Sequence, residues 1–268
     1  MLQYFLRPLS NPIFYSCCLI ALFLGACTST NPPSNDWQRL HLNGKVKQFE
    51  EWTYSSYATF TNEQHNNRQT NWFSKEGFLN KGLFYQTDNQ LRWTHYTYQS
   101  DSIWVRRTLQ VDGGAEQNQN YWLYELNAQG QQKKLTSLLL DTSVFYRINV
   151  DFNEQQLPKT LIYSEKIDPT IVPCEVHRTY TEQGKVQEEL VYVYDKANAQ
   201  CSTQPTTSTY TYNEQGDIER EKVIYYNGKE EIYSYQYRYD QAGNWTNRLH
   251  YAGDKVIEVT KRQFFYYE

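Results

Sequence analysis

A stretch near the end of the chain, YSYQYRYDQAGN (residues 233–244), places tyrosine at every second position and then breaks at turn-forming residues. Alternation with a period of two is typical of a β-strand, because successive side chains of a strand point to opposite faces. The Asp, Gly and Asn residues that follow are favoured in tight turns. The stretch therefore predicts a strand that runs into a turn.

The same pattern recurs along most of the chain. Aligned on the turn, the segments are NWFSKEGFL, YTYQSDSIW, YELNAQGQQ, VDFNEQQLP, RTYTEQGKV, YTYNEQGDI and YRYDQAGNW. Their turn positions are Gly77, Ser102, Gly130, Gln156, Gly184, Gly216 and Gly243, which lie 25 to 32 residues apart with a period near 27. A period of this length held over seven units predicts a repeat architecture.

The columns of this alignment have separate physical roles. Four residues before the turn stands an apolar, mostly aromatic residue, which predicts an inward-facing ladder across neighbouring strands. These residues are Phe73, Tyr98, Leu126, Phe152, Tyr180, Tyr212 and Tyr239. The next residue is usually a short polar one that can cap the turn through its side chain. The column five residues before the turn is polar except for Trp72, and we expect it to face water.

A second set of chain breakers falls about half a period further on. Asn227-Gly228 predicts a type I′ hairpin, and Asn43-Gly44 in LHLNGKVKQF predicts another. Each unit is then two antiparallel strands, and no stretch has a convincing helical period. The predicted fold is all-β, a long antiparallel meander of about fifteen strands built from seven repeats. A sheet this long twists, so we expect it to curl into an open or nearly closed sheet that the final strand RQFFYYE extends or closes.

The first residues are typical of a signal peptide. A short segment carrying Arg7 precedes an apolar run over residues 13–24, and the run ends in LGAC, residues 24–27. This motif resembles the lipobox of bacterial lipoproteins, which implies cleavage after residue 26 and a covalent lipid on Cys27. An ordinary secretory signal with a chance cysteine is the alternative. By analogy with enterobacterial lipoproteins, Thr28 in the position after the lipidated cysteine implies an outer-membrane location.

Residues 27–36 have the composition of a flexible tether, and residues 37–268 form a single predicted β-repeat domain.

Two further cysteines remain in the mature chain, Cys174 and Cys201. Both lie in insertions at the same edge of adjacent units, and an isolated pair in an oxidising compartment predicts a disulfide. Two free, partly buried thiols are the alternative.

The units YRYDQAGNW, YTYNEQGDI and RTYTEQGKV resemble the YD repeat of Rhs-type proteins. The resemblance extends from about Gly44 to the end of the chain, although only Tyr239-Asp240 has the Tyr-Asp pair in this register. It implies an extended curled β-sheet, an extracytoplasmic location and a binding role, and it implies no catalytic residues.

Composition and motifs give little support for catalysis. The net charge is −4 and no basic cluster is present, which argues against nucleic acid as a partner. The five histidines have no metal-ligand spacing, and pairs such as Glu188-Glu189 and Glu230-Glu231 are interpreted as surface charge. We therefore expect no enzyme, no metal and no cofactor besides the lipid on Cys27.

Three aromatic residues stand in columns that are otherwise polar, namely Trp72, Trp93 and Tyr121. Exposed rings bind sugars or partner proteins, so these residues are the candidate binding site, with burial under another segment as the alternative.

The predicted function is a non-enzymatic outer-membrane lipoprotein that binds a glycan or an envelope protein. A carrier of acyl chains or apolar peptides would need an apolar cavity. An integral barrel would need an apolar outer band, and the polar outer columns argue against it.

Overall fold

The computed structural model describes residues 35–86, 91–99, 102–110, 117–126, 132–139, 144–164, 173–195 and 200–268. The predicted signal peptide, the lipidation site Cys27 and most of the predicted tether lie outside the described residues. Neither helix within the described ranges has the length and apolar composition that crossing a membrane requires.

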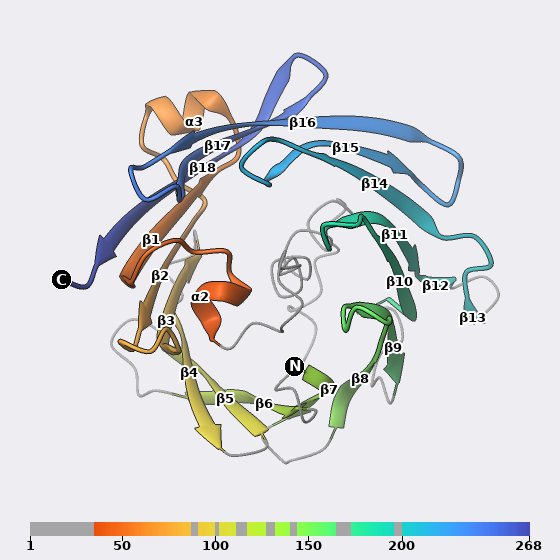
Figure 1. Ribbon diagram of the computed structural model, residues 1–268, viewed down its shortest axis with the longest axis horizontal. Coiled ribbons are helices and arrows are strands. Elements are labelled where there is room, and N and C mark those ends of the chain that lie inside the picture. Colours follow the sequence, from red (N-terminus) through yellow and green to blue (C-terminus); the bar gives the residue numbers. More distant parts are fainter. Residues whose placement is uncertain are drawn as a thin grey trace, which may run out of the picture.

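Sixteen of the described strands form one antiparallel sheet in which each strand pairs with its neighbours. Strand β1 pairs with both β2 and β18, so the sheet is a closed barrel (Figure 1). The strands are β1 (Val46–Tyr54), β2 (Asn67–Phe73), β3 (Leu79–Gln86), β4 (Leu91–Gln99), β5 (Ser102–Gln110), β6 (Gln117–Leu126), β7 (Gln132–Leu139), β8 (Val144–Phe152), β9 (Pro158–Ser164), β10 (Glu175–Tyr180), β11 (Val186–Tyr192), β14 (Thr206–Tyr212), β15 (Ile218–Ile224), β16 (Glu230–Tyr239), β17 (Trp245–Ala252) and β18 (Lys255–Tyr266). A separate two-stranded ribbon consists of β12 (Tyr194–Asp195) and β13 (Gln200–Cys201).

The predicted all-β meander is confirmed, and the seven repeats correspond to seven hairpins from β2–β3 to β16–β17. The chain ends provide the two remaining strands of the barrel. Strand β18, which contains most of the predicted closing segment, pairs with β1 over residues more than 200 positions apart in sequence, including Glu51 with Arg262. The sheet is thus fully closed.

Five described repeat turns have one common geometry. In each, the residue at the turn position has a left-handed backbone, with φ of 87° at Gly77, 61° at Gln156 and 76° to 92° at the other three glycines. Its amide donates to the carbonyl of the capping residue three positions earlier, for example from Gly184 to Thr181 at 2.9 Å. The capping side chain accepts from the amide that follows the turn, as Asn213 Oδ1 does from Asp217 at 2.9 Å. The predicted capping role is confirmed at Ser74, Asn153, Thr181, Asn213 and Asp240.

Three predicted turns differ from the structure. Ser102 is not a turn residue, because it pairs with Gln99 across a connection of two residues. Asn43-Gly44 is not a hairpin and instead links a helix to β1. Gly228 has a positive φ of 80° whereas Asn227 does not, so this turn is not type I′, which requires positive φ at both residues. The bond from the Gly228 amide to the Tyr225 carbonyl gives it the geometry of the repeat turns.

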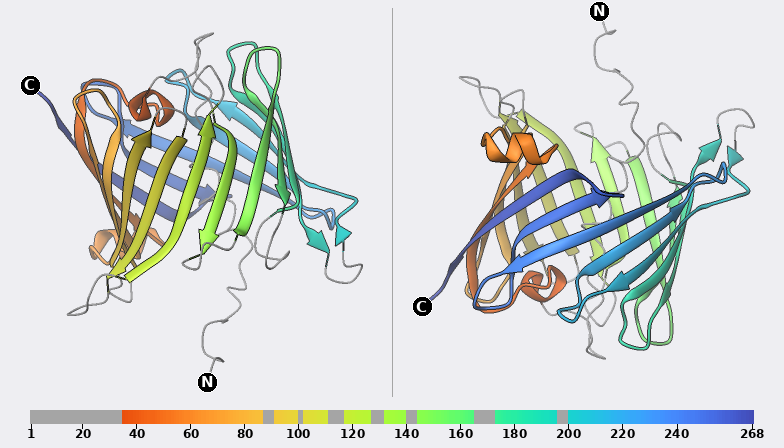
Figure 2. Two further views of the ribbon diagram at one scale, coloured as in Figure 1. Left: turned by 90° about the horizontal axis from the view of Figure 1, so that it is seen from below. Right: turned by 90° about the horizontal axis from the view of Figure 1, so that it is seen from above.

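Two short helices, which the sequence does not predict, lie at opposite ends of the barrel (Figure 2). Helix α2 (Asp36–Arg39) lies inside the ring of strands in Figure 1, and α3 (Tyr57–Thr61) follows β1 at the other end. The Asp36 carboxylate accepts from the Leu79 amide at 2.6 Å, and the Asp36 amide donates to the Gly77 carbonyl at 3.0 Å. Asp36 is buried, so the folded domain begins before residue 37 and the predicted tether is shorter.

The inner face of the barrel has both apolar and charged regions. One apolar cluster joins Phe49, Phe73 and Leu79 to Trp37 of α2, and a second contains Ile148, Leu161 and Val176. Between these clusters, polar side chains are also buried, among them Arg178 and Glu189. On the outer face, the predicted polar column is exposed at Asp151, Thr179, Thr211 and Arg238.

Candidate binding site

The outer face of the barrel at β18, β1, β2 and β3 has a row of aromatic and basic side chains. Lys261, Trp52, Arg68 and Tyr85 are successive cross-strand partners. The Arg68 guanidinium lies 5.8 Å from the Trp52 ring and 5.7 Å from the Tyr85 ring, and Lys261 Nζ lies 5.8 Å from Trp52. Cations at this distance from a ring face are attracted by its π electrons, so each group helps to hold the others in place.

Trp72 lies on the same face as Trp52. Its backbone partner on β1 is Gln48, four residues before Trp52. Trp72 also pairs with Lys81 on β3, and the Lys81 ammonium lies 5.2 Å from its ring. Trp72 is half-buried, and neighbouring Phe73 belongs to the inner core. We call Trp52, Arg68, Trp72, Lys81, Tyr85 and Lys261 the outer aromatic patch.

The strand register connects the three predicted site residues. Trp72, Lys81, His95, Arg106 and Tyr121 are successive backbone partners across β2 to β6. Trp93 pairs with Leu83 in the adjacent row. The three predicted positions therefore lie along two adjacent rows of the sheet, but Trp72 and Tyr121 are four strands apart, roughly 19 Å at the usual strand spacing. The side chains of Trp93 and Tyr121 lie outside the described residues, so only Trp72 is placed in full.

Cations outnumber acids in the outer aromatic patch. Arg68, Lys81 and Lys261 are its basic groups, and Glu50 is the acidic group bound to it, with Arg68 Nη2 at 2.9 Å from Glu50 Oε2. Such a surface suits an anionic partner whose apolar parts can lie on the rings. Sequence reasoning missed the other five members of the patch, because only the strand register brings them together: Trp52, Arg68, Lys81, Tyr85 and Lys261.

The inward tyrosine ladder has a structural role. Tyr180 OH donates to the Pro158 carbonyl at 2.5 Å and Tyr212 OH to the Val186 carbonyl at 2.6 Å. Tyr239 OH donates to Asp217 Oδ2 at 2.7 Å. Each hydroxyl thus bonds to the turn region of the preceding repeat, and burial raises the pKa of Tyr180 to about 12. These groups are occupied in holding neighbouring repeats together.

Charged pairs cross the inner face, which corrects the interpretation of the Glu-Glu pairs as surface charge. Glu189 is buried and accepts from Arg178 Nε at 2.7 Å, whereas neighbouring Glu188 is only partly buried. Arg248 pairs with Glu258 at 2.9 Å and Arg262 with Glu51 at 2.6 Å. His250 is buried between the rings of Tyr233 and Tyr235, at 5.1 and 4.5 Å. Alternation alone assigns the two glutamates of each pair to opposite faces, but it does not say which one is inside.

The two cysteines that the sequence pairs are joined by a disulfide, with a Cα–Cα distance of 5.9 Å between Cys174 and Cys201. Cys201 lies on β13 and Cys174 precedes β10, so the bond ties the β12–β13 ribbon to the barrel. Within the described ranges, no three His, Cys, Asp or Glu residues are grouped as metal ligands would be.

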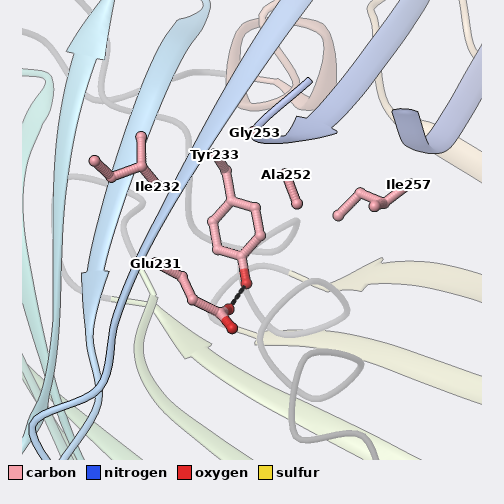
Figure 3. A pocket seen from close by; sticks show the side chains of 6 residues that line it. All are labelled: Glu231, Ile232, Tyr233, Ala252, Gly253 and Ile257. Atoms are coloured by element: carbon pink, nitrogen blue, oxygen red, sulfur yellow. Dashed lines mark hydrogen bonds between the residues drawn. The ribbon is translucent and has the colours of Figure 1, made fainter. Parts of the chain in front are cut away.

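A hollow of about 310 Å³ lies beside the β15–β16 and β17–β18 turns (Figure 3). It is lined by Glu231, Ile232, Tyr233, Ala252, Gly253 and Ile257. The Tyr233 hydroxyl donates to the Glu231 carboxylate, as Figure 3 shows. The walls are mainly apolar, and one carboxylate is the charged group among them.

Comparison with solved structures finds the same fold in porin-like proteins. A porin-like protein from Bacteroides uniformis is 12% identical with a TM-score of 0.50, and the match covers 89% of this chain and all of that chain. A porin-like protein from Bacteroides vulgatus is also 12% identical with a TM-score of 0.51, covering 83% and 98%. No family model and no curated protein matches the sequence. At this identity the likeness concerns the fold alone.

Proposed function

We propose that this protein is a lipid-anchored outer-membrane binding protein without catalytic activity, and that its outer aromatic patch binds an acidic glycan. The observation that carries the proposal is the arrangement of three cations against two tryptophans and a tyrosine on adjacent strands. The apolar faces of sugar rings pack on aromatic side chains, and the acidic groups pair with lysine and arginine.

The anchor follows from the lipobox-like LGAC sequence and from the docking of the segment that follows it. Asn35 Nδ2 donates to the Glu76 carbonyl at 2.8 Å, so the chain is fixed to the β2–β3 turn from residue 35 onward. The connection from Cys27 to Asn35 reaches about 28 Å at most when fully extended. A lipid on Cys27 would therefore hold the α2 end of the barrel near the membrane, and the outer aromatic patch on the side wall would stay accessible.

Other functions have less support. A carrier of acyl chains needs an apolar interior, but Arg178, Glu189 and Arg248 are among the inward side chains of this barrel. An envelope protein with an acidic surface could use the same patch, and the experiment below separates it from a glycan.

The test uses the protein made from its full coding sequence and reconstituted into nanodiscs. Binding to arrays of acidic and neutral glycans is measured for the wild type and for Trp72→Ala/Lys81→Ala. The double variant should lose at least about tenfold in affinity for acidic glycans, because a ring and a cation are both removed. Tyr226→Ala/Lys222→Ala is the matched control, since it removes a ring and a lysine near β15–β16, and it should bind like the wild type.

Affinity should also fall as salt is raised, because Lys261 is exposed to solvent and Arg68 and Lys81 are partly exposed. Equal losses in the two double variants, or equal binding of neutral and acidic glycans, would contradict the proposal. If acidic glycans are not bound but an acidic envelope protein is captured through Trp72 and Lys81, the glycan assignment is wrong.

The lipid anchor has a separate test. Cys27→Ser should move the protein from the membrane fraction to the soluble fraction.

A further inference from the structure

The hollow at the β15–β16 turn contains a carboxylate that three neighbouring groups approach. Glu231 Oε2 accepts from Tyr225 OH at 2.8 Å and from Tyr233 OH, and these two hydroxyls lie 3.2 Å apart. The opposite oxygen, Oε1, lies 2.5 Å from Lys229 Nζ. Glu231 therefore accepts from two tyrosine hydroxyls at one oxygen and pairs with an ammonium group at the other.

The ammonium group of Lys229 shows what this arrangement binds. It lies 5.9 Å from the Tyr225 ring while it pairs with the carboxylate. An aromatic ring and a carboxylate that meet the same cation form the kind of cage that recognises organic ammonium groups. Here the cation belongs to the protein itself, because Lys229 directly follows Asn227-Gly228 in the β15–β16 turn.

Lys229 is weakly held. Its side chain is 64% exposed, and exposed ion pairs contribute little to stability. The carboxylate has a firmer position, since it accepts from two tyrosines and its side chain is only 26% exposed. The bonds from Lys229 and the tyrosines lower the pKa of Glu231 to about 2, so the group is a carboxylate at neutral pH. A second cation could thus replace Lys229 without disturbing the acceptor.

The hollow beside the carboxylate has room for a small molecule. Its volume of about 310 Å³ is at the lower end of the range for ligand pockets. Ala252, Gly253 and Ile257 provide apolar walls that suit methyl or methylene groups. We propose that this hollow binds a small organic ammonium compound, with its cation on Glu231 Oε1 beside the Tyr225 ring, in the place of Lys229, and its apolar part against Ala252 and Ile257.

The neighbouring ion pair on the outer face provides a matched control. Glu230 pairs with Lys222 at 2.9 Å, and both side chains are more than 40% exposed. Glu230 is adjacent to Glu231 in sequence, but it is not among the residues that line the hollow. It therefore has the same kind of charge and the same kind of partner without the apolar walls.

The experiment measures binding of choline by calorimetry to the full-length protein in nanodiscs, with 3,3-dimethyl-1-butanol as the uncharged analogue of the same shape. The wild type should bind choline saturably and the analogue at least about tenfold more weakly, because only choline has the charge. Lys229→Met should tighten choline binding about tenfold, since the competing internal cation is gone. Glu231→Gln should abolish the binding and keep an acceptor for the tyrosines.

Glu230→Gln and Lys222→Met should leave the affinity for choline unchanged. Unfolding midpoints of all variants are measured in the same buffer, and Lys229→Met is informative even if Glu231→Gln is unstable. The proposal fails if neither the wild type nor Lys229→Met binds choline, if the uncharged analogue binds equally well, or if Glu230→Gln weakens binding as much as Glu231→Gln. Loss of glycan binding in the outer aromatic patch would not affect this result, because the two sites share no residue.

Discussion

Burial changes the pKa values of polar side chains on the inner face of the barrel. His250 is 6% exposed and packs between two tyrosine rings of β16, with Arg248 on its own strand and Glu258 as its backbone partner on β18. Burial, together with the charge of Arg248, lowers the pKa of His250 to about 4. The imidazole is therefore neutral in the folded protein at pH values where a free histidine is protonated.

This lowered pKa predicts a specific loss of stability in acid. Between about pH 6.5 and 4 the unfolded chain takes up a proton at position 250 that the folded chain does not, so stability falls as the pH falls. At pH 4.5 the loss from this one group is about 2–3 kcal/mol. His250→Phe keeps a ring but cannot take up a proton, so it should remove the loss of unfolding free energy that His250 causes in acid. Urea unfolding at pH 7 and pH 4.5 measures this difference. If the variant loses as much stability in acid as the wild type, or if His177→Phe has the same effect, the assignment is wrong.

The buried pair of Arg178 and Glu189 gives a second prediction at this scale. Arg178→Met leaves the Glu189 carboxylate buried without its cation and should cost about 3–5 kcal/mol. Arg178→Met/Glu189→Leu removes both charges and should recover most of that loss. The free energy of unfolding in urea measures both variants. Lys222→Met, in an exposed pair, should change it by less than about 1 kcal/mol. A double variant no more stable than Arg178→Met would contradict this account.

The repeat turns and the short helices interact at the level of elements. Helix α2 is docked on the β2–β3 turn, because the amides of Asp36 and Trp37 both donate to the Gly77 carbonyl. Trp37 Nε1 also donates to the Val46 carbonyl at 2.7 Å, which joins the helix to β1. At the opposite end of the barrel, α3 contacts β1 and β18, and its Phe60 ring lies 5.2 Å from the Tyr54 ring of β1.

Two turn glycines with similar backbones should respond differently to alanine. Gly77 and Gly228 have φ of 87° and 80°, so an alanine at either position is strained to a similar degree. A Cβ at Gly77 would also lie 2.7 Å from Asn35 and Trp37, whereas a Cβ at Gly228 meets no atom within 4 Å. Gly77→Ala should therefore destabilise the protein by about 1–3 kcal/mol more than Gly228→Ala. Thermal unfolding compares the two, and equal losses would mean that α2 docking contributes nothing.

The whole barrel depends on contacts between distant parts of the chain. Closure joins β1 to β18, and Asn244 bonds both to Asn43 and to the Tyr266 hydroxyl, which links the last repeat turn to both chain ends. The disulfide adds one covalent link across 27 residues.

Loss of the disulfide should lower stability without abolishing the fold. Cross-linking a loop of this length contributes roughly 3 kcal/mol, chiefly by restricting the unfolded chain. Cys174→Ser/Cys201→Ser should therefore unfold at a lower temperature than the wild type, and reducing agent should affect the wild type but not the variant. Circular dichroism should retain the β-sheet spectrum, because the strand pairings of β10 and β11 do not depend on the bond. A variant as stable as the oxidised wild type would contradict the prediction.

The repeating strand–turn–strand units, the capping residues such as Asn213 and Asp240, and the inward position of Phe73 could all be predicted from the amino-acid order. These features depend on residues a few positions apart, so turn chemistry and the two-residue period are enough to predict them. The closure of the sheet, the inward position of Glu189 and Glu231, and the place of Arg68 between Trp52 and Tyr85 became known from the folded barrel. Strand register and burial arise from pairings between distant segments of the chain, so local sequence patterns do not specify them.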